Sequence, residues 1–225
     1  MRRFVVIGLG RFGTKLAIAL SMSGAEVIAI DKDRNPIEMI RDQVSLAVRL
    51  DSTDEEALKA QGVGKADVAI LGMGQQNFES AILTVVNLRQ MGIAQIYARA
   101  ESLTQGEVFS KVGATEVIYP EIESAQRWAY KLIAPQIGEK LDLAPGHSLA
   151  RLKAPPSFDG RTVMDLQLRQ KYNVNLVLIK RGDHGKAKKS EQDAIINVMP
   201  ETIIYEDDIL MIAGSDADLV RLPQE

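Results

Sequence analysis

The sequence predicts an α/β protein, in which a doubly wound parallel sheet is followed by a second, smaller α+β domain. Over residues 1–134, short β-branched runs alternate with helical patterns. Several of these runs are apolar at consecutive positions, which is typical of strands covered on both faces of a parallel sheet. Near Pro135 the alternation stops, and glycine and proline residues interrupt a stretch that contains no long helix. We therefore expect two domains, residues 1–134 and 147–225, joined by a linker over 135–146.

Each strand of the first domain is a short apolar run, and each helix follows a turn or a capping residue. The predicted strands are Phe4–Ile7, Glu26–Ile30, Leu46–Arg49, Val68–Leu71, Gln95–Ala98 and Glu116–Tyr119. The predicted helices are Gly10–Ser21, Pro36–Arg41, Asp54–Gln61, Phe78–Met91, Ser102–Val112 and Glu121–Ala134. Strands that alternate with helices in this way predict a Rossmann-like sheet.

The second domain has shorter elements and mixed order. The predicted strands are Ser148–Leu152, Val174–Ile179, Thr202–Tyr205 and Ile209–Ala213, and the predicted helices are Thr162–Arg169 and Asp216–Leu222. A turn is expected over 181–185 and a solvated basic hairpin over 186–189.

Composition excludes several classes of protein. The chain has 225 residues, of which 46% are apolar and 25% charged, as in ordinary globular proteins. A net charge of −3 gives no support to a nucleic acid partner or a polybasic membrane anchor. The lack of cysteine excludes disulfides, thiolate metal sites and a cysteine nucleophile. Since no apolar run suits a signal peptide or a membrane span, we expect a cytoplasmic protein.

A glycine-rich loop follows the first predicted strand and opens the first predicted helix. Gly8, Gly10 and Gly13 fit the pattern G-x-G-x-x-G. Glycines at this spacing permit a tight turn and let backbone N–H groups approach a diphosphate at the helix N-terminus. Asp31 follows the last glycine by 18 residues and ends the second strand, where an acid can bind ribose hydroxyls.

An alternative interpretation needs no ligand: the glycines would only let the helix pack on the sheet, and Asp31 would cap the next helix. The agreement of strand, loop, helix and acid favours nucleotide binding. Asp31 would also repel a 2′-phosphate, which disfavours NADP. Arg11 is an unusual residue for a helix start, and its charge is best explained by a local anion; otherwise it is simply exposed.

The sequence offers no catalytic group for a dehydrogenase. Its two histidines, His147 and His184, both lie beyond the first domain, and no tyrosine is followed four positions later by lysine. A nucleotide site without such chemistry points to sensing, with the ligand selecting between conformations. Two alternatives remain, an NAD-dependent oxidoreductase and a structural oligomer with a vestigial site.

Several motifs together resemble the RCK family, the regulators of potassium conductance that include the TrkA and KtrA gating subunits. They are Gly8-Leu9-Gly10-Arg11-Phe12-Gly13, Asp31-Lys32-Asp33, Asp51-Ser52-Thr53, Tyr119-Pro120-Glu121 and the small C-terminal module. The resemblance covers nearly the whole chain and implies a nucleotide-binding N-terminal lobe and a C-terminal lobe of the TrkA-C (RCK-C) type.

The resemblance also implies roles for individual residues, with ATP, ADP or NAD(H) as the ligand. The resemblance implies that Gly8, Gly10, Arg11, Phe12 and Gly13 hold the phosphates, that Arg99 approaches them, and that Asp31 binds the ribose. It further implies that Asp51, Ser52 and Thr53 contact the adenine, that Gly72 and Gly74 lie close to the ligand, and that Lys32 belongs to the same site. The stretch 51–53 equally suits a helix N-cap, and Arg99 equally suits a plain surface arginine. Glu121 matches an acidic position that helps bind a divalent cation, Mg²⁺ or Ca²⁺, at a dimer interface; it also resembles an ordinary first-turn helix acid.

For the assembly, the resemblance implies a homodimer that forms a ring, an octamer, on a membrane-embedded potassium transporter subunit of the TrkH or KtrB kind. The protein would then lie peripherally at the inner face of the plasma membrane. Residues 163–166 and 169–172 resemble a region where some KtrA-type subunits bind cyclic di-AMP. Trp128 is expected to be buried, either within the chain or in the interface with a partner subunit.

Overall fold

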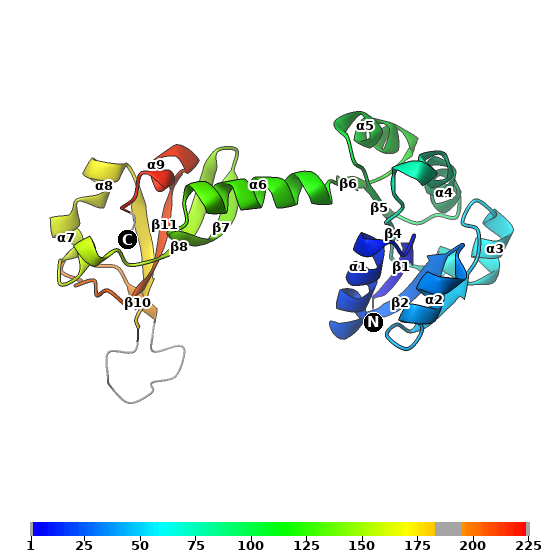
Figure 1. The fold of residues 1–225 in the computed structure, drawn as a ribbon, viewed down its shortest axis with the longest axis horizontal. Coiled ribbons are helices and arrows are strands. Elements are labelled where there is room, and N and C mark those ends of the chain that lie inside the picture. The colour runs from blue at the N-terminus through cyan, green and yellow to red at the C-terminus, as the bar shows by residue number, and fades with distance from the viewer. Residues whose placement is uncertain (1, 183–194, 224–225) are drawn as a thin grey trace. The chain divides into compact units, whose positions relative to one another are not determined.

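The computed structural model describes residues 2–182 and 195–223 of the protein. The chain divides into two compact units, Met1–Ser124 and Ala125–Glu225, each with its own sheet (Figure 1). The turn and the basic hairpin expected over 181–189 lie, apart from 181 and 182, outside the described residues, as does His184.

The N-terminal unit is built on a six-stranded parallel sheet, which confirms the predicted Rossmann-like fold. The strands, in the order β3-β2-β1-β4-β5-β6 across the sheet, are β1 (Arg3–Ile7), β2 (Glu26–Asp31), β3 (Leu46–Arg49), β4 (Val68–Leu71), β5 (Gln95–Arg99) and β6 (Glu116–Ile118). The α-helices are α1 (Arg11–Met22), α2 (Arg34–Ile40), α3 (Glu55–Ala60), α4 (Phe78–Gln90), α5 (Leu103–Val112) and the start of α6 (Pro120–Ile133).

Helices cover both faces of this sheet. Ala17 of α1 and Ile40 of α2 are fully buried with one set of strand side chains. Leu58 of α3, Val85 of α4 and Phe109 of α5 are buried with the opposite set. Burial on both faces explains why the strand sequences are apolar at consecutive positions rather than alternating.

The strand order reverses between β1 and β4, because β2 and β3 lie on one side of β1 and β4 to β6 on the other. The connections leaving β1 and β4 therefore diverge to opposite faces, which opens a crevice at the carboxyl ends of these strands. The sheet topology thus places this crevice beside the glycine-rich loop.

The C-terminal unit is built on a five-stranded sheet whose strands pair in antiparallel fashion. In the order β10-β9-β11-β8-β7 these strands are β7 (Ile137–Ala144), β8 (His147–Lys153), β9 (Asn175–Lys180), β10 (Ile195–Asn197) and β11 (Ile209–Ser215). The short helices are α7 (Val163–Leu166), α8 (Leu168–Tyr172) and α9 (Asp216–Val220).

Three details of this unit differ from the sequence prediction. The stretch 135–146, expected as a linker, contains the edge strand β7, which pairs with β8; its polar, exposed residues hide the strand pattern. Thr202–Tyr205 forms only an isolated bridge from Ile203 to Thr162, and Ile195–Asn197 takes the place beside β9. The helix expected over Thr162–Arg169 is broken at Gln167, which has a φ of 49°.

Helix α6 is amphipathic, and the described residues bury none of its side chains, although Tyr130 packs partly against the core of the C-terminal unit. Trp128, expected to be buried, is 53% exposed, and Leu132 is 75% exposed. Burial of Trp128 inside one chain is therefore not observed; the interface with a partner subunit is the other expectation. Within the described residues, none of the helices has both the length and the apolar character that crossing a membrane requires.

Candidate functional site

A cavity of about 340 Å³ lies at the carboxyl ends of β1, β2 and β4, at the reversal of strand order. Nine residues predicted from the sequence line it: Gly8, Gly10, Asp31, Lys32, Asp51, Ser52, Gly72, Gly74 and Arg99. Other lining residues, among them Leu50, Met73, Asn77 and Ser80, were not predicted as contacts from the sequence. Met73 follows β4 and lies between Gly72 and Gly74, which were predicted. Its place between these two glycines is the only feature of the sequence that could have indicated a lining residue.

Four predicted nucleotide contacts, Arg11, Phe12, Gly13 and Thr53, do not line the cavity. Gly13 lies behind the loop, because a Cβ at this position would stand 2.0 Å from the Gly8 carbonyl oxygen. Arg11 is exposed on the first turn of α1, and its side chain makes no hydrogen bond or ion pair with the part of the chain that the structure describes.

The glycines of the loop serve two different purposes. Gly8 has a φ of +89°, which disfavours other residues, and a Cβ there would lie 2.7 Å from the Met73 side chain. Gly72 is also tight, with Gly8 oxygen 2.8 Å from its Cβ position. Gly10 differs, because nothing lies within 4 Å of its Cβ position, although it lines the cavity. Close packing thus explains Gly8, Gly13 and Gly72. It does not explain Gly10, whose Cβ position lies in open space at the cavity.

The N-terminus of α1 is suited to an anion. Its N-cap is Gly10, which offers no side chain, and the first turn of this fully described helix contains no acid. The first N–H groups of a helix have no partner within the helix, and they carry its positive dipole end. A diphosphate beside Gly10 would supply the missing acceptors.

Asp31 organises the loop as well as lining the cavity. Its Oδ2 accepts a hydrogen bond from the Leu9 N–H at 2.6 Å, and its Oδ1 accepts one from the Asp33 N–H at 2.9 Å. The residue at the N-cap of α2 is Asp33, so capping of that helix does not account for Asp31.

The stretch after β3 combines a turn with a polar wall of the cavity. Asp51 accepts hydrogen bonds from the Thr53 N–H and hydroxyl, at 3.0 and 2.8 Å, and these bonds lower the pKa of Asp51. The N-cap of α3 is Asp54, whose carboxylate accepts from the Ala57 N–H, so Asp51, Ser52 and Thr53 do not fill that role. Ser52 is buried and shares a 2.8 Å hydrogen bond with Thr84.

Arg99, at the end of β5, connects the cavity to the start of α6. Its side chain is only 15% exposed and its Nη2 donates to Glu101 at 3.2 Å and to Glu121 at 2.7 Å. Its Nε is buried without a hydrogen-bond partner among the described residues. Arg99 is therefore not a plain surface arginine. Two ion pairs fix its guanidinium at the cavity, and its Nε–H remains available as a hydrogen-bond donor.

Glu121, the expected cation ligand, lies in the first turn of α6 and forms an ion pair with Arg99. No group of three acidic or histidine side chains that could hold a metal ion occurs in the described residues. Within one chain the arginine is thus the counterion of Glu121, and any metal ion would have to compete with it.

Comparisons with known proteins agree with this architecture. The model of the TrkA-N domain matches residues 4–120, and the model of the TrkA-C domain matches residues 148–222. The chain is 36% identical over 220 residues to Ktr system potassium uptake protein C of Bacillus subtilis, an alignment that covers 98% of this chain and 95% of that protein. The chain belongs to the RCK family of TrkA-N and TrkA-C proteins.

Further relatives of this RCK chain support the assignment. Ktr system potassium uptake protein A of Bacillus subtilis is 30% identical over 224 residues, covering 100% of this chain and 96% of that protein. The GsuK RCK domain has a TM-score of 0.56 at 23% identity, covering 96% of this chain and 44% of that chain. The GsuK channel bound to NAD also has a TM-score of 0.56 at 23% identity, covering 97% and 37%. At this identity the solved structures establish the shared fold.

The TrkA-C unit of this RCK chain has a larger cavity, of about 510 Å³, on the β7–β8 side of its sheet. Its lining residues include Pro135, Gly138, Arg151 and Lys153. They do not include residues 163–172, the region that resembles a cyclic di-AMP site. The smaller cavity of the TrkA-N unit remains the better site, because a glycine loop, a helix N-terminus and a buried arginine converge on it.

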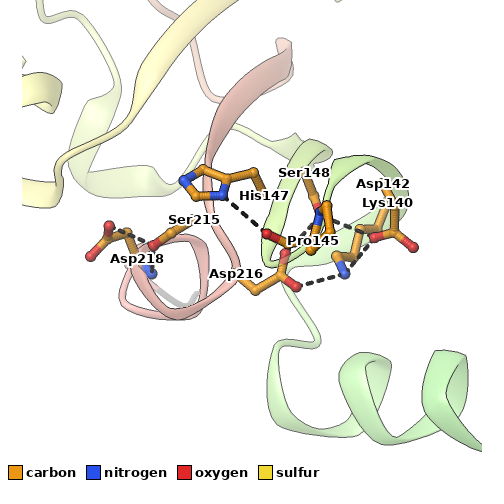
Figure 2. Close-up of polar contacts among 8 residues, drawn as sticks. All are labelled: Lys140, Asp142, Pro145, His147, Ser148, Ser215, Asp216 and Asp218. Atoms are coloured by element: carbon orange, nitrogen blue, oxygen red, sulfur yellow. Dashed lines mark hydrogen bonds and ion pairs between the residues drawn. The ribbon is translucent and has the colours of Figure 1, made fainter.

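A polar cluster in the TrkA-C unit links its β7–β8 hairpin to α9 (Figure 2). Lys140 forms ion pairs with Asp142 at 2.7 Å and with Asp216 at 3.0 Å. The Ser148 hydroxyl lies 3.1 Å from Asp142 Oδ1 and 2.6 Å from Asp216 Oδ1, so the two carboxylates share its one proton. Ser148 is completely buried, so it is a structural residue and not an exposed nucleophile. The Lys140 ammonium also lies 4.7 Å from the centre of the Tyr130 ring, which ties the end of α6 to the hairpin.

We expect Lys140→Met to lower the free energy of unfolding of the TrkA-C unit by about 1 kcal/mol at neutral pH. Hydrogen bonds from Lys140 and Ser148 lower the pKa of Asp142 in the folded protein. The Asp142 carboxylate therefore stabilises the folded unit at any pH above the usual aspartate pKa, and this stabilisation is lost as the pH falls through the lowered pKa. The variant should therefore lose part of this acid-sensitive stability. Urea unfolding from pH 7 to pH 3 measures the effect. Lys153→Met, which removes an exposed lysine of β8, is the control, and an equal effect of both substitutions would contradict the account.

Proposed function

We propose that this protein is a nucleotide-sensing regulatory subunit of a potassium-uptake system. In this proposal residues 1–134 bind ATP, ADP or NAD(H), and residues 147–225, together with the edge strand β7 that pairs with them, form a regulatory domain. The observation that carries the proposal is the convergence of Gly10, the uncapped N-terminus of α1 and Arg99 on one cavity. The named relatives are potassium uptake proteins, and GsuK structures of the same fold hold NAD and ADP.

The ligand would lie with its diphosphate against Gly8, Gly10 and the first turn of α1, including the backbone of Phe12 and Gly13. Asp31 and Lys32 would lie beside the ribose, and Asp51, Ser52 and Thr53 beside the base. Gly72 and Gly74 would keep the opposite wall open, and Arg99 would meet the terminal phosphate. Arg11 is free to reach the same phosphate or a ligand in a neighbouring subunit.

Regulation of potassium uptake requires contact with the subunit that carries potassium across the membrane. We propose a membrane-embedded potassium transporter subunit of the TrkH or KtrB kind, contacted from the cytoplasmic side by a ring of homodimers, an octamer. The uncovered apolar face of α6 supports an interface between copies, because exposed side chains such as Trp128 and Leu132 are costly to leave in water.

A divalent cation at Glu121 and cyclic di-AMP near residues 163–172 belong to the same proposal. Glu121 supplies one carboxylate per chain, so a cation site would need Glu121 of a second copy or oxygens of the nucleotide. Thr162 caps α7, and the hydrogen bond from its hydroxyl lowers the pKa of Asp165, so this carboxylate is fixed in position next to Met164, an exposed apolar side chain.

The proposed switch is tested by comparing ADP with ATP on the purified protein. We expect both nucleotides to raise the melting temperature, by different amounts, and to produce different scattering profiles of the assembly. Equal stabilisation together with identical profiles would contradict a nucleotide switch. Oxidation of NADH in the presence of small carbonyl compounds would instead favour an oxidoreductase.

A further inference from the structure

Arg99 both lines the cavity of the N-terminal unit and forms an ion pair with Glu121 in the first turn of α6. We infer that an anionic group in this cavity and the carboxylates of Glu101 and Glu121 compete for Arg99, so that ligand binding releases the start of α6. This inference rests on the proposed function, because it takes the terminal phosphate of a nucleotide as the competing anion.

The competition follows from a shortage of positive charge, because one guanidinium faces two carboxylates. One guanidinium nitrogen, Nη2, serves two carboxylates, at 3.2 Å and 2.7 Å. The single positive charge of Arg99 therefore balances only one of two nearby negative charges. A phosphate that takes a bidentate pair of hydrogen bonds from Arg99 would turn the guanidinium away from them, since its planar donors point in fixed directions. The two carboxylates would then repel each other without a counterion.

Each carboxylate is attached to a different structural element. Glu101 lies in the loop after β5, and its Oε1 also accepts the Gln75 N–H at 3.2 Å beside Gly74. Glu121 lies in the first turn of α6 and is 61% exposed, so it has room to move. Release of Arg99 thus acts on one fixed acid and one movable acid, and the movable acid belongs to α6.

Helix α6 can carry this change along its own length. Trp128 lies seven residues after Glu121, two helical turns along the same face. It is the only tryptophan in the sequence, so all tryptophan emission of the protein comes from this position on α6. Glu101 and Glu121 are therefore positioning residues: they hold Arg99 until an anion takes it, and they transmit the event to α6.

The experiment measures ADP and ATP binding to the full chain by calorimetry, together with Trp128 emission. Glu121→Gln and, independently, Glu101→Gln should tighten binding by about three- to tenfold, because each removes a competitor for Arg99. The emission change that ligand causes in the wild type should already be present in unliganded Glu121→Gln. Glu107→Gln, which removes an exposed charge from α5, should behave as the wild type. Thermal unfolding of each variant verifies that it is folded.

A double-mutant cycle isolates the role of Arg99. In an Arg99→Gln background, Glu121→Gln should no longer tighten binding, because the group under competition is gone. If the wild type binds ADP, but Glu121→Gln and Glu101→Gln bind it with the same affinity as Glu107→Gln, the competition for Arg99 is refuted while the nucleotide site is upheld. If the wild type binds neither nucleotide, the proposed function and the relay both fail.

Discussion

Replacing Gly13 with alanine is expected to destabilise the N-terminal unit by about 3 kcal/mol or more and to abolish nucleotide binding. The added methyl group would stand 2.0 Å from the Gly8 carbonyl oxygen and 3.1 Å from its carbon. Both atoms belong to the backbone of the loop, which leaves β1 and is fixed by the Leu9 N–H bond to Asp31. Relief of the clash would therefore shift the loop itself. Urea unfolding and ADP calorimetry measure the two effects.

Gly10→Ala is the matched substitution, three residues earlier in the same loop. Its φ of −67° suits alanine, and no atom lies within 4 Å of the added carbon. The unliganded stability should change by no more than about 1 kcal/mol, whereas ADP affinity should fall at least about tenfold, because the methyl group enters the cavity. Wild-type stability of Gly13→Ala would refute the packing argument, and wild-type affinity of Gly10→Ala would refute the placement of the phosphates.

The second large effect is expected at Asp208 in the C-terminal unit. This carboxylate is completely buried and accepts hydrogen bonds from Arg181 at 2.8 Å, the Tyr205 N–H at 2.9 Å and the Gly182 N–H at 3.2 Å. Asp208→Ala should lower the free energy of unfolding of this unit by about 3 kcal/mol, because it removes a buried carboxylate and leaves its three partly buried donors without an acceptor. The value lies at the low end for a buried pair, since Arg181 retains 22% exposure to water.

Urea unfolding followed by Trp128 fluorescence measures this loss, since Trp128 lies in the C-terminal unit. Glu201→Ala, an exposed acid in the same segment of the chain, is the control and should change stability by less than about 0.5 kcal/mol. An Asp208→Ala variant as stable as this control would show that the buried network does not stabilise the unit.

The first domain was predictable because its signals are local and agree with one another. A buried run, a glycine loop, a helix and an acid at a fixed spacing specify the parallel sheet and the crevice at its strand reversal. The second domain was less predictable. Its edge strand β7 has polar, exposed residues, and its bridge at Ile203 depends on a partner distant in sequence.

The site shows the same division. The glycines and Asp31 could be located from spacing, but their different roles could not, because only the packing distinguishes Gly13 from Gly10. Arg99 and Glu121 are 22 positions apart in the sequence, and no pattern links them. The sheet brings β5 and β6 side by side, so that the two residues meet after the strands end. A contact of this kind depends on tertiary structure and has no local sequence pattern.

The central claim is that the crevice beside Gly10 holds a nucleotide diphosphate without transforming it. Calorimetric titration of the full chain with ADP, ATP, NAD and NADH, followed by chromatography of the recovered nucleotides, tests this most directly. We predict saturable binding of at least one of them, with micromolar or tighter affinity and complete recovery of the unchanged nucleotide. Failure of all four to bind, or consumption of the bound nucleotide, would contradict the account.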